Sequence, residues 1–130
     1  MAGRYLTPEE RIEFNNNVWD TVREIPSGRV ATYGQIAGYV NPPQAVDPGA
    51  YRAFGPRWVG AAMKFCPDDV PWQRVINAQG KISVQGDTAR LQRQLLLQEG
   101  VRFDRKDRVD LSIYQWKKNA DALSQLELPI

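Results

Sequence analysis

The chain has 130 residues, 42% of them apolar and 25% charged, which predicts a single domain over residues 1–130 with one core. It contains no histidine, which excludes a Ser-His-Asp or Cys-His catalytic site and a histidine-ligated metal site. Its one cysteine excludes an internal disulfide and is typical of a reducing compartment. We expect no membrane span and no secretory signal, because the apolar runs are short. The net charge of +2 neither requires nor forbids nucleic acid, since the placement of charge matters more than its sum.

The first predicted helix begins at Pro8. Thr7 suits the N-cap, Pro8 suits the first helical position, and Glu10 completes a capping-box pattern. The apolar side chains that follow at helical spacing, and that we assign to the core, are Phe14, Val18, Val22 and Ile25. Turn residues at positions 26–28 end this helix, and residues 29–31 are expected to form a short extended link.

A second capping box, Thr32 with Gln35, predicts a short helix that runs to Val40. Residues 41–55 are rich in Pro, Gly and Ala without a clear period, so we expect a surface loop. This loop is either inert, which we favour, or a source of additional contacts through Arg52. Pro56 is expected to open a third helix, the recognition helix of a helix-turn-helix pair. The expected inward side chains of this helix are Val59, Ala62 and Met63. Its expected exposed side chains are Arg57 near the N-terminal end, Trp58 and Lys64.

The second half of the chain predicts a hairpin and one more helix. Residues 77–80 indicate a turn between two short strands, the second of them around residues 81–83. Asp87 is expected to cap a fourth helix, and Gly100 is expected to end it as the C-cap. The two leucines that share a face on this helix are Leu91 and Leu95.

The order of these elements predicts the fold class. Helix, turn, helix and hairpin in succession indicate an α+β protein, namely a single winged helix-turn-helix DNA-binding domain with a small β-hairpin wing. The tail from about residue 103 to residue 130 mixes apolar and charged residues. We expect the tail to pack partly on the core and to fray at its end.

Three segments carry the functional signal. They are residues 25–37 (IPSGRVATYGQIA), residues 57–63 (RWVGAAM) and residues 70–77 (VPWQRVIN). In order and spacing they resemble the C-terminal domain of the O6-alkylguanine-DNA alkyltransferases, which carries IPxGxVxTYGxIA, RxVGxAM and PCHRV. The resemblance covers about residues 12–102, and three motifs in one order are far more specific than any one of them.

Two departures in the third segment decide what the resemblance implies. In the alkyltransferases the cysteine of PCHRV accepts the alkyl group, and the histidine beside it, backed by a glutamate, takes the proton. This chain has Trp72 and Gln73 at those two positions, and Glu99 is expected to correspond to the glutamate. An indole is not a thiolate and an amide is not a base, so we expect no catalytic residue and no alkyl transfer.

The chain is therefore similar to the alkyltransferase-like proteins, which carry PWHRV or a close variant. That resemblance implies a non-enzymatic damage sensor that binds double-stranded DNA, flips O6-alkylguanine into a pocket, and passes the lesion to nucleotide excision repair proteins. It implies no cofactor and no metal, a monomeric state, and an intracellular location, in the cytoplasm with the nucleoid if the host is bacterial. Flipping costs a few kcal/mol, and less where alkylation has weakened the base pair.

The DNA-binding residues that the resemblance implies are Tyr33, Arg57, Gly60, Ala61 and Lys64. Arg57 would fill the gap left by the flipped base, since a planar cation can stack and can bond to the unpaired cytosine. Taken alone, Arg57 is equally a phosphate contact or a surface charge. Tyr33 would press on the 3′ phosphate of the target, and the alternative is a half-buried ring at a helix start. Gly60 and Ala61 would permit close approach in the minor groove, and tight helix packing explains them equally well.

The lesion-pocket residues that the resemblance implies are Tyr33, Pro71, Trp72, Val75 and Gln85. The backbone carbonyls of Trp72 and Val75 would accept hydrogen bonds from the guanine amine. Trp72 is alternatively a core aromatic residue that fills the space of a lost active site. Gln85 stands where family members carry tyrosine or arginine, and glutamine stacks on a base less well.

Two functions of other classes stay open. One is an active alkyltransferase that uses Cys66 as an unusual acceptor, although a chain without histidine offers that thiol no obvious activator. The other is a winged-helix transcription regulator that reads base sequence and ignores damage. The few polar side chains expected on the exposed face of the third helix are a poor base-reading set.

Overall fold

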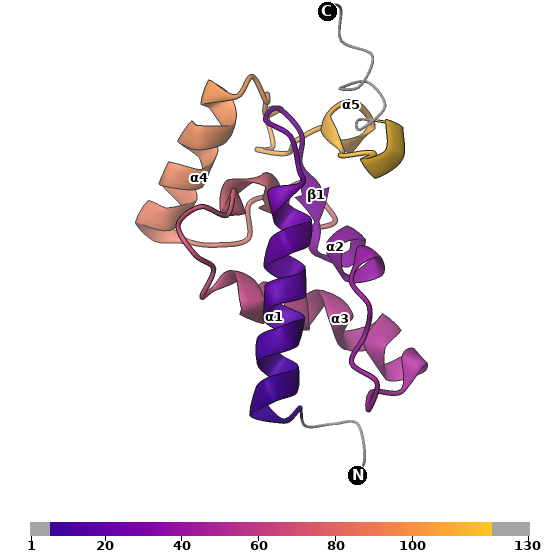
Figure 1. Cartoon of the computed structure of the whole chain (residues 1–130). Coiled ribbons are helices and arrows are strands. Elements are labelled where there is room, and N and C mark those ends of the chain that lie inside the picture. Colours follow the sequence, from indigo (N-terminus) through magenta and orange to yellow (C-terminus); the bar gives the residue numbers. More distant parts are fainter. Residues whose placement is uncertain (1–5, 121–130) are drawn as a thin grey trace, which may run out of the picture.

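The structure is a computed structural model that describes residues 6–120. Its elements in chain order are the helices and strands α1 (Pro8–Arg23), β1 (Ala31–Thr32), α2 (Tyr33–Tyr39), α3 (Pro48–Met63), the 3₁₀ turn η1 (Trp72–Arg74), β2 (Val75–Ile76), α4 (Gly86–Gln98) and α5 (Leu111–Tyr114). Helix α1 runs along the front of the molecule and α3 crosses behind it (Figure 1). Helices α4 and α5 lie at the top of this view, away from the start of α1. No helix within residues 6–120 is both long enough and apolar enough to cross a membrane.

The first two helices begin where the sequence predicts. The hydroxyl of Thr7 accepts from the Glu10 N–H at 3.1 Å. At the start of α2 both halves of the capping box form, with the Gln35 N–H donating to Thr32 Oγ1 at 3.0 Å and the Thr32 N–H donating to Gln35 Oε1 at 3.4 Å. In α1, by contrast, the Glu10 oxygen Oε2 is buried without a hydrogen-bond partner among the described residues. The predicted capping box is therefore confirmed in full for α2. For α1 the bond to the Thr7 hydroxyl is confirmed.

The third helix corrects the prediction of a loop over residues 41–55. Helix α3 begins at Pro48, so the loop is confined to residues 41–47. Asp47 is the N-cap and accepts from the backbone of the first turn, and Pro48 occupies the first helical position. Pro56, which was expected to open the helix, lies inside it and removes one backbone donor from its middle. The Asp47-Pro48 pair was the signal for this start, and the nearby glycines and prolines and the lack of a clear apolar period masked it.

The added half of α3 is fixed by aromatic packing. The Tyr51 side chain is buried, and its hydroxyl donates to the Ala37 carbonyl of α2 at 2.8 Å. The rings of Phe14, Tyr51 and Trp58 meet edge-on, with centroids 6.0–6.2 Å apart. Trp58 was expected to be exposed on α3, and that prediction is wrong, because this cluster half-buries it between α1 and α3.

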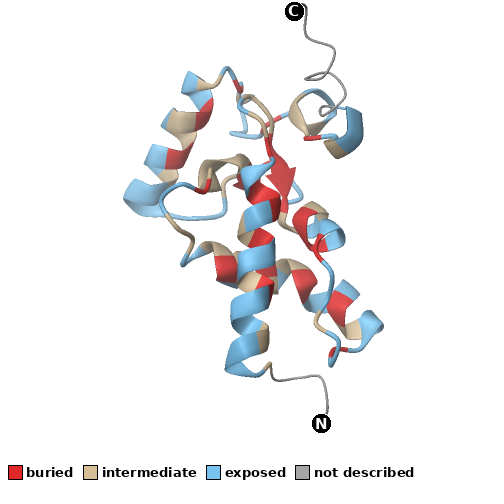
Figure 2. Cartoon of the chain, in the orientation of Figure 1, coloured by how far each residue is buried: buried red, intermediate tan, exposed pale blue. Residues whose placement is uncertain are grey.

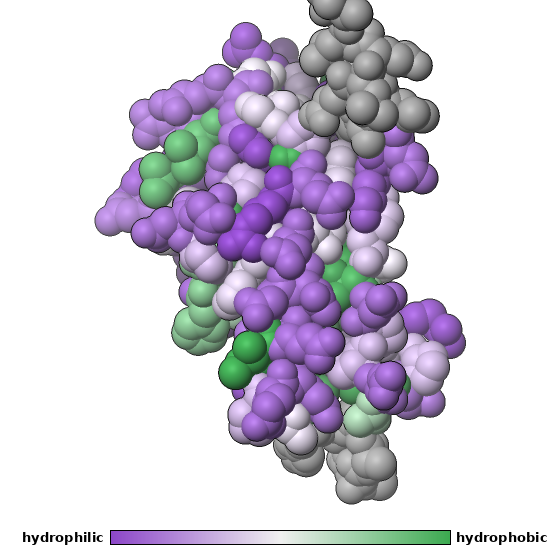
Figure 3. Space-filling model, in the orientation of Figure 1, coloured by the Kyte–Doolittle hydropathy of each residue, from purple (hydrophilic) through white to green (hydrophobic). Residues whose placement is uncertain are grey.

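The core consists of two adjoining clusters. The inward faces of α1, α2 and α3 make the larger one, and the outward faces remain exposed (Figure 2). Its members include the predicted α1 stripe of Phe14, Val18, Val22 and Ile25, together with Val59 and Ala62, and Met63 packs against it half-buried. The second cluster lies under α4 and comprises Val30, Ile76, Leu96, Val101 and Val109. The face of the molecule that α1 covers is largely hydrophilic, with isolated apolar patches (Figure 3).

The sheet confirms the α+β class but not the hairpin wing. Strand β2 pairs with β1 in parallel, with Ala31 opposite Val75 and Thr32 opposite Ile76. The predicted turn is present, since the Gly80 N–H donates to the Asn77 carbonyl at 3.0 Å, but residues 81–83 form no strand. The side chains of β2 are both buried, so this segment finds its partner inside the core and not in an exposed hairpin.

Helix α4 departs from the prediction at its start and on its inward face. Gln85 and not Asp87 is the N-cap, and Leu91 is exposed, because α4 buries Gln92 and Leu96 instead. The predicted end is correct. Gly100 has φ +90°, and the N–H groups of residues 100 and 101 return to the carbonyls of residues 97 and 96 at 3.0 Å each. This is a Schellman motif, which requires a left-handed residue at that position.

The described part of the tail folds onto the core. Phe103 pairs with Val109 in an antiparallel bridge, and Val30 pairs with Gln115 in a parallel one. Trp116 is buried in the larger cluster. The tail therefore packs on the core at least to Trp116, and the end that was expected to fray lies outside the described residues.

Two glycine substitutions test the Schellman motif. A Cβ at Gly100 meets nothing within 4 Å, and the same holds for Gly38 in α2, but only Gly100 is left-handed. We expect Gly100→Ala to lower the free energy of unfolding by about 1–2 kcal/mol. The matched control Gly38→Ala should leave it unchanged or raise it by about 0.5 kcal/mol. Urea denaturation measures both, and equal effects of the two variants would contradict the motif.

Candidate functional site

A cleft of about 1150 Å³ opens between the exposed face of α3, the segment after β2 and the start of α4. The residues implied by the resemblance that line it are Tyr33, Arg57, Gly60, Ala61, Lys64, Trp72, Val75 and Gln85. Lining residues that the sequence did not point to include Ser83 and Gln92. Pro71 is not among the lining residues, so its expected place in the pocket wall is not what the structure gives.

Pro71 shapes the backbone that leads to Trp72. It has φ −76° and ψ 67°, and the Trp72 N–H donates to the Val70 carbonyl at 2.7 Å, which together define an inverse γ-turn. The chain then makes the 3₁₀ turn η1, in which the Val75 N–H donates to the Trp72 carbonyl. Trp72 is half-buried on the cleft wall. Its indole thus lines the cleft, and its carbonyl keeps one lone pair for a further donor.

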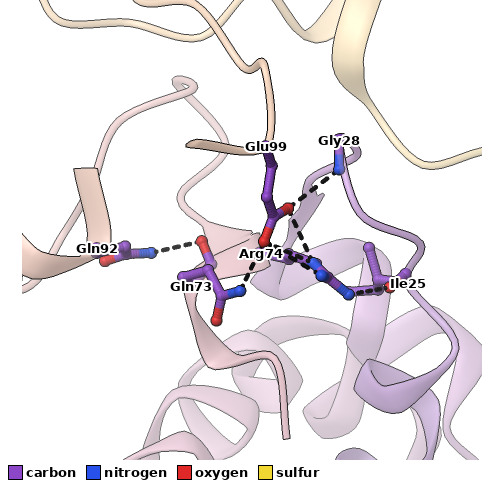
Figure 4. Close-up of polar contacts among 6 residues, drawn as sticks. All are labelled: Ile25, Gly28, Gln73, Arg74, Gln92 and Glu99. Atoms are coloured by element: carbon purple, nitrogen blue, oxygen red, sulfur yellow. Dashed lines mark hydrogen bonds and ion pairs between the residues drawn. The ribbon is translucent and has the colours of Figure 1, made fainter. Parts of the chain in front are cut away.

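Glu99 is the polar hub behind this turn (Figure 4). Its Oε2 accepts from Gln73 Nε2 at 2.8 Å, and its Oε1 accepts from Arg74 Nε at 3.0 Å and from the Gly28 N–H at 3.0 Å. Arg74 extends further and donates through Nη1 to the Ile25 carbonyl at 2.8 Å. One carboxylate therefore connects the end of α4, the turn η1 and the segment after α1.

The protonation state of Glu99 follows from these contacts. Burial by itself raises the pKa of Glu99, but the hydrogen bonds from Arg74, Gly28 and Gln73, together with the Arg74 charge, outweigh it and lower the pKa below its ordinary value. The carboxylate is therefore ionised at neutral pH, and Gln73 is held as a donor to it. An amide in this position can orient the loop, but it has no basic lone pair with which to take a proton from a neighbour.

Gln92 is a site residue that the sequence analysis missed. It is 3% exposed, and its Nε2 donates to the Gln73 carbonyl at 3.1 Å and to the Val75 carbonyl at 3.0 Å. It lies seven residues before Glu99, so both residues face the turn from the same side of α4. A buried glutamine in a helix needs partners, but the sequence alone does not say which groups they are.

Tyr33 bridges the two sides of the cleft. Its hydroxyl oxygen lies 3.0 Å from Ser83 Oγ, which belongs to the segment that leads into α4. On the other side its ring lies over α3, where a Cβ at Gly60 would be 4.0 Å from the ring carbons. The ring is half-buried at the start of α2, as the alternative interpretation expected, and it also lines the cleft.

The part of α3 that faces the cleft carries small and basic residues. Arg57, Ala61 and Lys64 are exposed, and Gly60 lies between them. Arg57 was expected near the helix start, but it lies in the middle of α3 because the helix begins at Pro48. Its guanidinium carbon is 5.9 Å from the centroid of the Phe54 ring, a cation–π contact.

Cys66 also lines the cleft, half-buried just beyond the end of α3. Burial raises the pKa of its thiol, so the thiolate is scarce at neutral pH. Among residues 6–120 no group of three or more Asp, Glu or Cys side chains is placed to hold a metal ion. The cleft therefore offers shape, apolar surface and hydrogen-bonding groups, and the one cysteine on its wall has a thiol with a raised pKa.

Comparison with known proteins adds relatives of two kinds. A DNA base-flipping protein of Escherichia coli (strain K12) is 38% identical over 117 residues, which cover 85% of this chain and 83% of that protein. Alkyltransferase-like protein 1 of Schizosaccharomyces pombe is 41% identical over 113 residues, which cover 81% of this chain and 95% of that protein. Methylated-DNA–protein-cysteine methyltransferases are also among the relatives.

The fold agrees with these relatives. The crystal structure of S. pombe Atl1 in complex with damaged DNA containing O6-carboxymethylguanine matches with a TM-score of 0.63 and 38% identity, over 82% of this chain and 96% of that chain. Residues 13–101 match the family described as 6-O-methylguanine DNA methyltransferase, DNA binding domain, and this range contains most of α1, the residues that line the cleft, and Glu99. The chain belongs to the family of the 6-O-methylguanine DNA methyltransferase DNA-binding domain.

Proposed function

We propose that this protein is a non-enzymatic sensor of O6-alkylguanine in double-stranded DNA, which flips the altered base into the cleft and marks it for nucleotide excision repair. The observation that carries the proposal is Trp72 on the cleft wall, where the transferases place the acceptor cysteine, beside Gln73 bonded to an ionised Glu99. The site keeps the geometry of a base pocket and lacks both the nucleophile and the base.

The α3 face of the cleft supplies the duplex contacts in this proposal. Arg57 enters the stack and fills the space of the flipped base, and Lys64 neutralises a phosphate. Gly60 and Ala61 keep the helix surface low, so that it can approach the floor of the minor groove. Tyr33 presses on the 3′ phosphate of the target from the opposite rim. These side chains line one cleft, and this common location supports a single binding event.

The flipped guanine is then held by the turn around η1. The Trp72 carbonyl accepts from the Val75 N–H, and the Val75 carbonyl accepts from Gln92 Nε2. A carbonyl oxygen has two lone pairs, so each of them can also take the exocyclic amine of guanine. The indole of Trp72 provides an apolar wall for the alkyl group. Pro71 acts through the backbone turn, and Gln85 covers the cleft from the start of α4 with weaker stacking than an aromatic residue.

A second candidate function rests on one observation, that the Cys66 thiol lines the same cleft. In that case the protein is an alkyltransferase with an atypical acceptor. Its raised pKa argues against it, because alkyl transfer needs the thiolate. A sequence-reading regulator is disfavoured further, since half-burial of Trp58 leaves the α3 face with few side chains that can read base edges.

The proposed setting follows from the function. We place the protein inside the cell with the chromosome, in the cytoplasm if the host is bacterial, acting as a monomer without metal or cofactor. Its partners are lesion-bearing duplex DNA and, after recognition, proteins of nucleotide excision repair. A passive sensor needs such a partner, because it leaves the lesion in the DNA.

The first prediction separates sensing from transfer. The protein should bind a duplex with one O6-methylguanine more tightly than the matched guanine duplex, because the weaker pair is cheaper to open. Its intact mass should be unchanged after prolonged incubation, since no thiolate faces the base. Binding titrations and mass spectrometry measure the two results. A gain of one methyl group that disappears in Cys66→Ser would establish the alkyltransferase instead.

The second prediction concerns Arg57. Replacement by Ala removes the group that fills the vacated stack, so we expect lesion binding to weaken about tenfold and base flipping to be lost. The probe is the fluorescence of 2-aminopurine paired in the duplex, which rises when a base leaves the stack. The matched control is Arg105→Ala, which removes an exposed arginine of the same charge outside the cleft. Equal loss in both variants would reduce the role of Arg57 to net charge.

The third prediction tests what Gln73 replaces. Trp72→Cys alone supplies a thiol, but about a few per cent of it is thiolate at neutral pH without a base. Adding Gln73→His places an imidazole where the amide now lies 2.8 Å from Glu99, so the double variant should transfer a methyl group faster than the single one. Transfer of labelled methyl from DNA to protein gives both rates. Equal rates would mean that Trp72 alone accounts for the lack of transfer.

A further inference from the structure

The exposed face of α3 continues beyond the cleft into the half of the helix before Pro56. The α3 residues that line the cleft begin at Pro56, yet Arg52 and Phe54 are exposed on the preceding turns. The whole helix from Pro48 to Met63 contains two arginines and no carboxylate. Helix α3 therefore presents no carboxylate of its own that would repel a phosphate backbone, and Phe54 extends the exposed surface beside Arg57 that we propose binds DNA.

The rigid back of this half keeps Phe54 pointing outward. Tyr51 is buried and bonded to the Ala37 carbonyl of α2 at 2.8 Å. A Cβ placed on Gly55 would come within 3.2 Å of the Ala37 side chain, so the two helices touch closely at this point. Helix α3 thus has little freedom to turn its exposed side inward. Phe54, 47% exposed, is presented to solvent by a fixed platform.

Phe54 stands beside Arg57 at a spacing that suits stacked bases. The two side chains are three residues apart on one helix, and the guanidinium carbon lies 5.9 Å from the ring centroid. Bases in a duplex stack at about 3.4 Å, so two groups that enclose one base pair lie about 6.8 Å apart. A small outward movement of either flexible side chain converts the present contact into that separation.

We propose that Phe54 is a second DNA-inserting residue of this protein. When Arg57 fills the gap left by the flipped base, the Phe54 ring stacks on the adjoining base pair. Aromatic rings and apolar wedges at minor-groove interfaces unstack neighbouring bases and are tolerant of sequence. The inference rests on the proposed function, because it uses the same α3 face and the same bound duplex.

The experiment compares wild type with Phe54→Ala and Phe54→Leu on O6-methylguanine and guanine duplexes that carry 2-aminopurine beside the central base. We expect the alanine variant to bind the lesion duplex about tenfold more weakly and to lose the fluorescence rise of the flanking probe. The leucine variant keeps an apolar wedge but no flat ring, so it should keep part of the rise and bind the lesion duplex more weakly than wild type. Ile113→Ala on α5 is the control, since it removes an exposed apolar side chain outside the cleft and should change neither measurement.

A double-mutant cycle with Arg57→Ala separates direct contact from help to Arg57. If Phe54 contacts DNA itself, its replacement still weakens binding when Arg57 is already alanine. If the effect vanishes in that background, or if Phe54→Ala binds both duplexes as well as wild type, the proposal is wrong. The proposed function is tested separately by the wild type, which must prefer the lesion duplex over the guanine duplex.

Discussion

The buried ion pair between Glu99 and Arg74 is the interaction on which the geometry of the cleft depends. Both side chains are largely buried, and the pair is bonded further, since Gly28 and Gln73 donate to Glu99 and Arg74 donates to the Ile25 carbonyl. A buried charge of this kind is tolerable only when it is paired and fully hydrogen-bonded, so these contacts have to form together. They fix the end of α4 against the turn that carries Trp72, and they thereby position Trp72 on the wall of the cleft.

This arrangement separates binding from chemistry. Recognition of a flipped base needs a fixed turn with outward carbonyls, and Glu99, Arg74 and Gln92 provide that turn whatever residue stands at position 72. Alkyl transfer needs in addition a thiolate and a group that takes its proton. Gln73 occupies the second position as a donor to Glu99, so it completes the hydrogen bonding of the hub without any acid–base function. In the proposed sensor the scaffold of the site is therefore kept, while the side chains at positions 72 and 73 account for the absence of transfer.

Local rules in the sequence predicted much of this structure. The caps of α1 and α2 and the Schellman end of α4 depend on neighbouring residues, and all three appear where expected. The motif resemblance brought the cleft residues together, although only a structure could exclude Pro71 from the lining. The prediction of a hairpin was wrong because β2 pairs with β1. In this pairing Ala31 lies opposite Val75, about 44 residues later in the chain, and strand pairing over such a distance has no local signal in the sequence.

The difference between local signals and long-range contacts also explains why the first half of α3 was not predicted. Its first half reads as a loop because Gly49 and Gly55 disfavour a helix, and the value of Gly55 appears only in three dimensions. Gly55 lets α3 approach α2, and Tyr51 then anchors that contact with a buried hydroxyl. Because these contacts fix the side of α3 that faces α2, the opposite side stays exposed to solvent in a defined orientation. The length of α3, set by the Asp47 cap, therefore determines how much basic and aromatic surface lies beside the cleft.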